Sequence, residues 1–299
     1  MDVEVFVRLS PEALRERLPV LVAEWVDDAL LRNTISAELA DLVASWSDSE
    51  VASIVDAVAA VGVERRLYTA HPLLRRAVRI WCGHVLAGST LEGVAHLAEA
   101  AAEGPTAVVC NHQSYVDSNA IDTVVFGHAP DELANRFVSA AGPKVYDGLF
   151  RRLASASLNT ILVPQSSTLG HTAQLPGRDL ARQSLQAVAQ SHAAMKDGHV
   201  LLIYPEGART RTGRMGPFLP AVYRYFKLPG TRIVPAALTG TADILRLGEL
   251  GVRPNACALR FGPPIDVEKS GGPREALTQA QSAVSDLLPP ELRPPRPTN

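Results

Sequence analysis

An apolar segment runs directly into a polar one over residues 106–117, which read TAVVCNHQSYVD. The first five of these residues are apolar or β-branched and follow Gly104 and Pro105, a pattern that predicts a short buried strand. His112 comes just after this strand, and Asp117 follows five residues later. Because ligands and catalytic groups gather at the carboxyl ends of strands in open α/β sheets, this stretch predicts both the fold class and a site.

His112 and Asp117 have the chemistry of an acid–base pair. A histidine exchanges a proton near neutral pH, and a carboxylate can orient its ring and stabilise the imidazolium. Residues five apart on one helix point about 140° away from each other, so the two would not meet on a shared helix. We therefore expect His112 in the turn after the strand and Asp117 in the first turn of the next helix.

From residue 104 onward, short apolar segments alternate with helical patterns. This alternation predicts an α/β domain with a largely parallel central sheet flanked by helices. The expected strands are 106–110, 136–140, 159–163, 199–204, 232–237 and 256–261. The expected helices lie near 117–127, 144–155, 178–196, 217–227, 241–247 and 273–287.

The chain before this domain has the pattern of an N-terminal helical bundle. Pro11 directly after Ser10 is typical of a helix start, and further start signals stand at 34–36 and 47–50. Nothing in this region indicates chemistry of its own. The expected organisation is a helical region over 1–75, an α/β domain over 76–288 and a disordered proline-rich tail over 289–299.

One helix near this boundary has a less ordinary pattern. It begins at Pro72 and carries Arg75, Arg76 and Arg79 beside apolar residues that include Trp81. Basic residues next to tryptophan and leucine are typical of a helix at a membrane interface. The alternative is a bundle helix whose arginines simply face water.

The bulk composition is that of a globular protein. The 299 residues are 46% hydrophobic with a formal net charge of −2, so no strong field predicts nucleic-acid binding. No apolar stretch reaches the ~18 residues of a membrane span, and the acidic N-terminus is unlike a signal peptide. We expect a cytoplasmic protein, with peripheral contact at the inner face of the membrane as a further expectation. The three cysteines are far apart and predict no metal site.

A second apolar run, residues 200–204, ends in the polar turn PEGARTR. Gly207 lets the backbone turn tightly, and Arg209 can bind a phosphate through two parallel hydrogen bonds. Arg211 adds positive charge, and Glu206 could accept hydrogen bonds from hydroxyls or hold an arginine. Alone, this turn would be read as a surface turn with solvated charges.

The two motifs together resemble the glycerolipid acyltransferase family, that is, the glycerol-3-phosphate and 1-acylglycerol-3-phosphate acyltransferases. The resemblance rests on N-H-x4-D after one strand and P-E-G-x-R after a later one, and it covers roughly residues 100–265. A helical N-terminal region without a membrane span is most similar to the soluble plastid-type glycerol-3-phosphate acyltransferases.

This resemblance implies a reaction and a set of partners. A fatty acyl group would pass from an acyl carrier protein or coenzyme A thioester to the hydroxyl of glycerol 3-phosphate or its 1-acyl derivative, without a metal or cofactor. His112 would be the general base and Asp117 its support. Backbone N–H groups at the helix start after His112 would stabilise the oxyanion.

The resemblance also implies that Glu206, Gly207 and Arg209 bind the acceptor. The membrane-bound members usually carry an arginine after the strand of a second motif, where this chain has Val163 followed by proline and glutamine. Phosphate binding would then fall to another basic residue from the same region. The candidates are Lys144, Arg151 and Arg152.

Two other classes of protein are alternatives to an acyltransferase. A serine hydrolase would need a nucleophile elbow, and no G-x-S-x-G is present, although Ser114 lies inside the first motif. A non-catalytic lipid- or acyl-carrier-binding module could share the same fold. The intact pair of His112 and Asp117 favours an enzyme over such a module.

Overall fold

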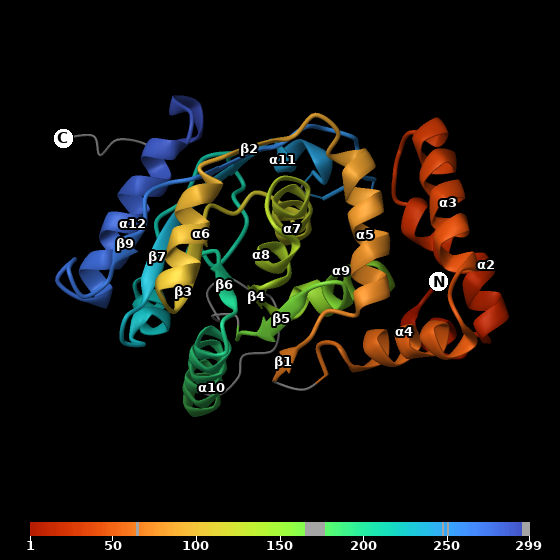
Figure 1. Cartoon of the computed structure of the whole chain (residues 1–299), viewed down its shortest axis with the longest axis horizontal. Helices are drawn as coiled ribbons and strands as arrows, with labels where there is room; N and C mark the ends of the chain where they lie inside the picture. Colours follow the sequence, from red (N-terminus) through yellow and green to blue (C-terminus); the bar gives the residue numbers. More distant parts are fainter. Residues whose placement is uncertain (64–65, 165–176, 247, 250, 295–299) are drawn as a thin grey trace.

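A mixed β-sheet crosses the middle of the molecule (Figure 1). The structure is a computed structural model that describes residues 1–63, 66–164, 177–246, 248–249 and 251–294. Within these residues the strands are β1 (Leu67–Tyr68), β2 (Thr90–Glu92), β3 (Thr106–Cys110), β4 (Phe137–Ala141), β5 (Asn159–Leu162), β6 (Val200–Ile203), β7 (Arg232–Thr239), β8 (Ala258–Phe261) and β9 (Ile265–Asp266).

The strand order is β1-β5-β4-β6-β3-β7-β8-β2, with β9 paired to β7. The five central strands from β5 to β7 pair in parallel, whereas β1 with β5, and β8 and β9 with β7, are antiparallel. The prediction of a largely parallel sheet flanked by helices is therefore confirmed. All six expected strands form. β1, β2 and β9 were not expected, because strands of two or three residues are too short to show an alternating pattern.

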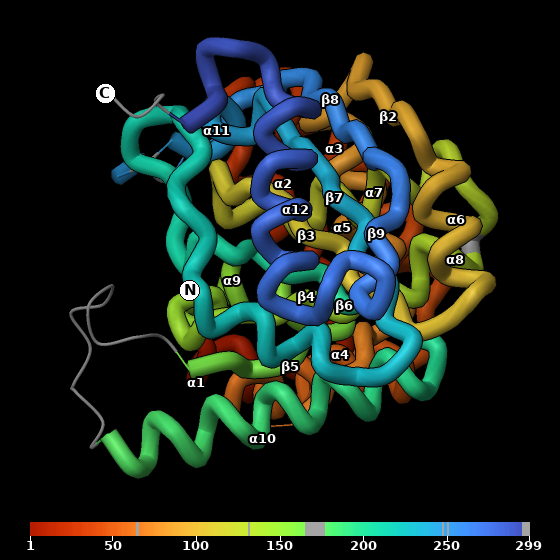
Figure 2. The backbone as a smooth tube through the Cα atoms, turned by 90° about the vertical axis from the view of Figure 1, so that its left-hand side faces the viewer, coloured from red at the N-terminus to blue at the C-terminus, as the bar shows by residue number. Residues whose placement is uncertain are grey.

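Helices cover both faces of this sheet. They are α1 (Val3–Phe6), α2 (Pro11–Ala23), α3 (Ala29–Ala44), α4 (Asp48–Ala60), α5 (Pro72–Val85), α6 (Val94–Glu103), α7 (Asp117–His128), α8 (Asp131–Asn135), α9 (Leu149–Ala156), α10 (Gly177–Lys196), α11 (Thr241–Ile244) and α12 (Pro273–Leu287), with 3-10 turns η1 (Pro143–Tyr146), η2 (Pro220–Phe226) and η3 (Pro290–Leu292). Figure 2 shows α12 lying along one face of the sheet. Ala187 and Ala194 of α10 pack on Val138 of β4 and Ile161 of β5.

The central strand β3 shows why both faces are covered. Its side chains alternate between two cores, because successive residues of a strand point to opposite faces. Val108 and Cys110 join the core beneath α5, α6, α7 and α9. Ala107 and Val109 join the core beneath α12 and η2. The strand is buried throughout, as its unbroken apolar run predicts.

Two of the three helix starts expected in the N-terminal region are observed. Ser10 caps α2, and Ser47 forms a capping box with Glu50 at the start of α4. The start expected at 34–36 is wrong, because Asp28 caps α3 by accepting from the N–H of Leu31. Residues 34–36 therefore lie inside a helix that has already begun.

The expected helix over 144–155 is divided in two. Gly148 has a φ of 80°, a backbone conformation that favours glycine, and it separates η1 from α9. The expected helix near 217–227 is the 3-10 turn η2. The short helix α8 was not expected.

The N-terminal helices share one core with the sheet. Leu14 and Ile54 of this region belong to the same buried cluster as Val108 of β3 and Leu259 of β8. The boundary expected between residues 75 and 76 falls inside α5, which runs unbroken from Pro72 to Val85. Figure 1 shows α5 between α2–α4 and the helices that cover the sheet.

The arginines of α5 serve the interior of the protein. Arg75 and Arg79 donate to the buried carboxylate of Asp122 in α7, at N···O distances of 2.6 and 2.8 Å. Neither the membrane-interface interpretation nor the solvated one is right for these two residues, because their charges pair with Asp122 between two helices. Arg76 is the exposed member of the group.

The end of the chain is ordered further than expected. Residues 290–292 form η3, and the carbonyl of Leu292 accepts from the N–H of Met215. The tail expected to be disordered from 289 onward therefore packs on the domain for its first residues. The remainder of that prediction, 295–299, lies outside the described residues.

Candidate active site

The two polar motifs lie next to each other at one edge of the sheet. β3 and β6 are parallel neighbours, and their register pairs Val109 with Ile203. Both strands therefore end at the same edge, where residues 111–117 follow β3 and residues 204–209 follow β6. Two segments far apart in the sequence are brought together by one pair of strands.

His112 lies in the turn after β3, and Asp117 is the first residue of α7, as the spacing predicts. Nδ1 of His112 lies 2.8 Å from Oδ2 of Asp117, whose side chain is buried. Because a carboxylate only accepts hydrogen bonds, Nδ1 carries the proton and Nε2 keeps its lone pair. His112 also lines a large cavity at this edge of the sheet, so its ring is placed to take up a proton there.

The same carboxylate oxygen shapes the turn between the two residues. Oδ2 of Asp117 also accepts from the backbone N–H groups of Gln113 (2.7 Å) and Ser114 (3.0 Å). Backbone N–H groups at this helix start were expected to stabilise an oxyanion. The N–H groups of Gln113 and Ser114 do not support that expectation, because both already donate to Asp117.

Further hydrogen bonds fix the backbone around His112. The N–H of His112 donates to Oε1 of Glu206 (2.7 Å), and its carbonyl accepts from the N–H of Thr210 (2.8 Å). The side-chain amide of Asn111 exchanges two hydrogen bonds with the backbone of Leu238 in β7. The two polar turns and β7 are thus bound into one unit that holds the histidine.

Glu206 connects these turns and does not line the cavity. Its second oxygen accepts from the N–H of Gly216 (2.7 Å), so both carboxylate oxygens are taken by backbone donors. Burial raises the pKa of Glu206 above its usual value, against the opposite effect of the two N–H donors. Gly207, with a φ of 71°, provides the tight turn that follows.

Tyr204, the last residue before this turn, packs directly on the histidine. The two rings stack with centroids 4.3 Å apart, and the phenol oxygen of Tyr204 lies 3.0 Å from the hydroxyl of Ser118. Burial raises the pKa of Tyr204 well above its usual value, so it remains a neutral hydroxyl. Two hydroxyls that share one hydrogen bond leave one O–H proton for a ligand. Sequence reasoning missed this pair, whose one signal is an aromatic residue at the strand end.

Two arginines contact the ring of Tyr115 beside the histidine. The guanidinium of Arg209 lies 3.5 Å from the ring centroid, and that of Arg151 lies 4.6 Å from it. Both arginines line the cavity. Neither has an ion-pair partner within the part of the chain that the structure describes. Positive charge of this kind favours an anionic group on a ligand.

The other basic candidates lie elsewhere. Lys144 does not line the cavity, and its carbonyl accepts from Arg151 (3.1 Å). Arg152 donates to backbone carbonyls, Val58 and Tyr146 among them. Arg211 is exposed outside the cavity. Of the three residues considered for phosphate, the structure therefore brings only Arg151 to Arg209 and His112.

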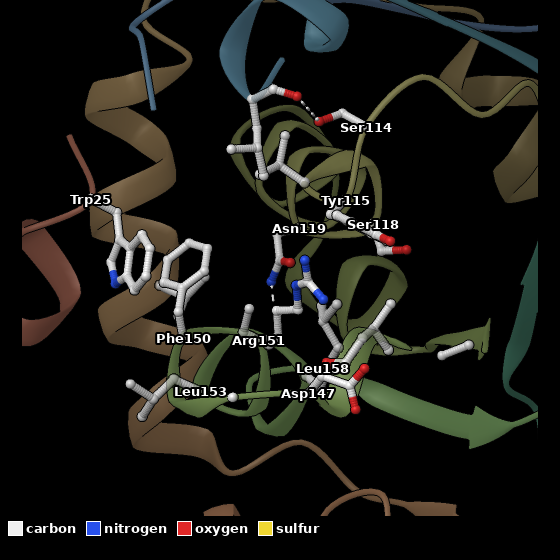
Figure 3. A pocket seen from close by; sticks show the side chains of 18 of the residues that line it. Trp25, Ser114, Tyr115, Ser118, Asn119, Asp147, Phe150, Arg151, Leu153 and Leu158 are labelled. Atoms are coloured by element: carbon white, nitrogen blue, oxygen red, sulfur yellow. Dashed lines mark hydrogen bonds between the residues drawn. The ribbon is translucent and has the colours of Figure 1, made fainter. Parts of the chain in front are cut away.

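The cavity has a volume of about 690 Å³, within the usual range for small-molecule sites. Its polar side holds the histidine, the two arginines and the Ser118–Tyr204 pair. The opposite side is an apolar wall formed by Val22, Trp25, Val78, Trp81, Phe150 and Leu153. Figure 3 shows Trp25 and Phe150 side by side, with Ser118 across the cavity from them. The N-terminal helices, from which no chemistry was expected, thus form part of the site.

Ser114 is not placed to act as a nucleophile. Its hydroxyl donates to the carbonyl of Leu245 (3.3 Å), a bond drawn in Figure 3. The ring of His112 pairs instead with Asp117 and stacks on Tyr204. The arrangement offers the serine hydrolase interpretation no support.

The described residues contain neither a candidate membrane span nor a candidate metal site. They contain no helix with the length and apolarity needed to cross a membrane. They also contain no group of three histidine, cysteine or acidic side chains arranged to hold a metal ion.

Comparison with known proteins gives one family. Residues 92–239 match the family model described as Acyltransferase. The 1-acyl-sn-glycerol-3-phosphate acyltransferase of Cocos nucifera is 35% identical over 29% of this chain and 28% of that protein. The enzyme of the same name from Limnanthes douglasii is 30% identical over 36% of this chain and 38% of that protein. These matches thus span well under half of each plant protein.

A solved structure is also similar. The 1-acyl-sn-glycerophosphate (LPA) acyltransferase PlsC from Thermotoga maritima is 14% identical, with a TM-score of 0.48 over 91% of this chain and 93% of that one. The residues matched by the family model contain both the histidine turn and the arginine turn described above. Residues 92–239 therefore belong to the acyltransferase family, and the plant relatives support a glycerolipid acyltransferase.

Proposed function

We propose that this protein transfers a fatty acyl group from a thioester to the hydroxyl of 1-acylglycerol 3-phosphate. One observation carries the proposal: the His112–Asp117 pair, Arg151 with Arg209, and an apolar wall all border the same cavity. That cavity offers a base, a phosphate site and space for a hydrocarbon chain. The plant relatives are named for the acylated acceptor, which favours it over glycerol 3-phosphate.

In this proposal His112 acts as a general base. The acceptor hydroxyl gives its proton to Nε2 as its oxygen attacks the thioester carbonyl carbon, forming a C–O bond and a tetrahedral oxyanion. Collapse of the oxyanion breaks the C–S bond, and the thiolate takes the proton back from Nε2. Asp117 accepts from Nδ1 throughout and stabilises the imidazolium. No acyl-enzyme and no cofactor is needed for the atoms to balance.

The acceptor phosphate would bind Arg209 and Arg151. Guanidinium groups match the geometry of phosphate oxygens through paired hydrogen bonds, and a ligand phosphate would supply the acidic partner that the described residues do not give them. Tyr115 holds both groups near the cavity through its ring. Glu206 and Gly207 would act on the acceptor indirectly, by fixing the turns around His112 and Arg209.

The donor would be an acyl carrier protein or coenzyme A thioester. Both present the same acyl thioester to the cavity, and the apolar wall would receive its chain. The two donors differ in the group that carries the thioester, which is a protein in one case and a nucleotide in the other. This group would lie outside the cavity. A direct comparison of turnover with each donor decides between them.

Peripheral contact with the inner face of the membrane belongs to the same proposal. An acylated acceptor and a diacylated product are lipids, which favours work at a membrane surface. The arginines of α5 give this idea no support, because Arg75 and Arg79 pair with Asp122. In a flotation assay, part of the protein should rise with vesicles that contain anionic lipid. A protein that stays wholly in the aqueous fraction would contradict the idea.

Thiol release measures the proposed reaction directly. Wild-type protein is given acyl thioester and either glycerol 3-phosphate or 1-acylglycerol 3-phosphate, beside His112→Ala and Asp117→Asn. We expect release that depends on the acylated acceptor and falls about 10²–10⁴-fold in His112→Ala. Absence of acceptor-dependent release from the wild type would instead support the non-catalytic binding module.

A further inference from the structure

The backbone N–H groups around the histidine already have acceptors. Those of Gln113 and Ser114 donate to Oδ2 of Asp117. That of His112 donates to Oε1 of Glu206. Acyl transfer from a thioester passes through a tetrahedral oxyanion, which is stabilised by hydrogen-bond donors already in place in the cavity. The three residues that begin at the histidine therefore have no free backbone donor for such an oxyanion.

A pair of hydroxyl groups lies beside the histidine. The ring of Tyr204 stacks on that of His112, with centroids 4.3 Å apart and an angle of 19° between the ring planes. The phenol oxygen of Tyr204 lies 3.0 Å from the hydroxyl oxygen of Ser118, the residue after Asp117. Both hydroxyl residues line the cavity, and Figure 3 shows Ser118 across it from Phe150. The pair therefore contacts the histidine ring and borders the space that a ligand would fill.

One proton of this pair is free to bind a ligand. Each hydroxyl carries one proton, and the single hydrogen bond between them uses one of the two. Neither oxygen has a second partner among the residues that the structure describes. Burial, together with the nearby charge of Asp117, raises the pKa of Tyr204 well above its usual value, so the phenol keeps its proton. A neutral hydroxyl at the edge of the cavity is a donor for negative charge.

The phenol is the better of the two donors to an anion. A phenol is more acidic than an aliphatic alcohol, and a more acidic O–H group makes a stronger hydrogen bond to negative charge. Of the two directions that the 3.0 Å contact allows, donation from Ser118 to Tyr204 leaves the phenol proton free. A hydroxyl that accepts one hydrogen bond also donates the next one more strongly.

We propose that the hydroxyl of Tyr204, oriented by Ser118, donates a hydrogen bond to the oxyanion of the tetrahedral intermediate. The inference rests on the proposed function, in which the acceptor oxygen attacks the thioester carbonyl carbon beside His112. As the C–O bond forms, the π electrons of the carbonyl group move to its oxygen. The phenol O–H stabilises that charge without giving up its proton. When the electrons return, the C–S bond breaks and the thiolate takes the proton from Nε2 of His112.

The first test removes the phenol hydroxyl and keeps the ring that stacks on His112. Tyr204→Phe should lower kcat about 10²–10³-fold, as loss of one oxyanion donor does, with the KM for the acceptor nearly unchanged. Ser118→Ala should lower kcat only about two- to tenfold, because the phenol remains. Tyr146→Phe is the matched control. It removes the hydroxyl of another buried tyrosine that does not line the cavity, and its kcat should equal that of the wild type.

Two further readouts separate a hydrogen bond to the oxyanion from an effect through the histidine. The pH dependence of kcat/KM reports the protonation of His112, and it should be the same in Tyr204→Phe as in the wild type, because the stacked ring is kept. A dithioester donor, in which sulfur replaces the carbonyl oxygen, is a much weaker hydrogen-bond acceptor. With this donor the kcat values of the wild type and Tyr204→Phe should come close to each other.

The outcomes separate this inference from the proposed function. A Tyr204→Phe variant with the kcat of the wild type would overturn the inference alone. A loss of kcat that comes with a shifted pH profile, or that is equally large with the dithioester, would also overturn it. If Tyr204→Phe does not fold, Ser118→Ala carries the test: its smaller loss should vanish with the dithioester, and persistence would overturn the inference. Absence of acceptor-dependent turnover by the wild type would contradict the proposed function itself.

Discussion

Two pairs of arginines in this molecule have opposite surroundings. Arg75 and Arg79 share one buried carboxylate, Asp122, between α5 and α7. Arg151 and Arg209 contact the ring of a tyrosine at the cavity, with no acidic partner among the described residues. The first pair has its counter-charge within the protein and links α5 to α7. The second pair is available to an anionic ligand. The presence or absence of an acidic partner in the protein therefore distinguishes a structural arginine from a binding one.

Removing the acidic partner of the first pair should have the largest effect. Asp122→Ala leaves the buried Arg75 and the partly buried Arg79 without their counter-charge. Loss of one partner from a buried ion pair costs about 3–5 kcal/mol. Urea unfolding should show this loss. Asp243→Ala, which breaks an exposed pair with Arg246, is the control and should change stability by less than about 1 kcal/mol. Equal losses of unfolding free energy in Asp122→Ala and Asp243→Ala would contradict a structural role for the Arg75–Asp122–Arg79 group.

Loss of an arginine from the second pair should weaken acceptor binding and leave the stability of the protein nearly unchanged. Arg209→Ala removes charge-assisted hydrogen bonds to the acceptor phosphate, each worth about 1.5–3 kcal/mol, so the KM for the acceptor should rise roughly tenfold to a hundredfold. The free energy of unfolding should hardly change, because the substitution leaves no buried carboxylate without its counter-charge. Arg211→Ala tests the exposed neighbour and should leave KM near the wild-type value. Destabilisation by Arg209→Ala as large as that of Asp122→Ala would contradict this account.

A smaller effect is expected at the ring between the arginines. Tyr115→Leu removes cation–π contacts of about 0.5–2 kcal/mol, and the acceptor KM should rise several-fold as the two guanidinium groups lose their support. Tyr115→Phe keeps the ring and should behave like the wild type. Steady-state kinetics with varied acceptor separates the two variants; equal KM values for Leu and Phe would show that the ring has no such role.

The smallest effect concerns Glu206, the acidic residue closest in sequence to Arg209. Its pKa is raised by burial, so the folded state holds the proton more tightly than the unfolded state does. The wild type should therefore lose stability relative to Glu206→Gln as the pH rises from about the usual value of 4.5 through the raised pKa. Urea titrations across this range measure the difference. The reverse slope would mean that Glu206 is stabilised as a carboxylate, as a counter-ion of Arg209 would be.

The sequence predicted best what is local in the chain. Asn111, His112 and Asp117 lie within one strand-to-helix turn, so their roles as a unit follow from their spacing. The six longer strands followed from short, mainly apolar segments. Their parallel arrangement then brought Arg209 to the same edge of the sheet as His112.

What depends on contacts between distant segments was not predictable. The sequence could not choose Arg151 over Arg152, because the two are adjacent and only the folded chain separates them: Arg151 lines the cavity, and Arg152 donates to backbone carbonyls. It could not pair Arg75 with Asp122, which lie on different helices. Nor could it place Trp25 in the site, because that wall forms only when the N-terminal helices pack on α9.

The central claim is that one cavity combines His112 with a phosphate site at Arg209. The most direct measurement compares kcat/KM for 1-acylglycerol 3-phosphate with that for the same acceptor lacking its phosphate, in wild type and Arg209→Ala. We predict that the wild type prefers the phosphorylated acceptor by about a hundredfold and that Arg209→Ala loses most of this preference. Equal rates with both acceptors in the wild type, or an undiminished preference in Arg209→Ala, would contradict the account.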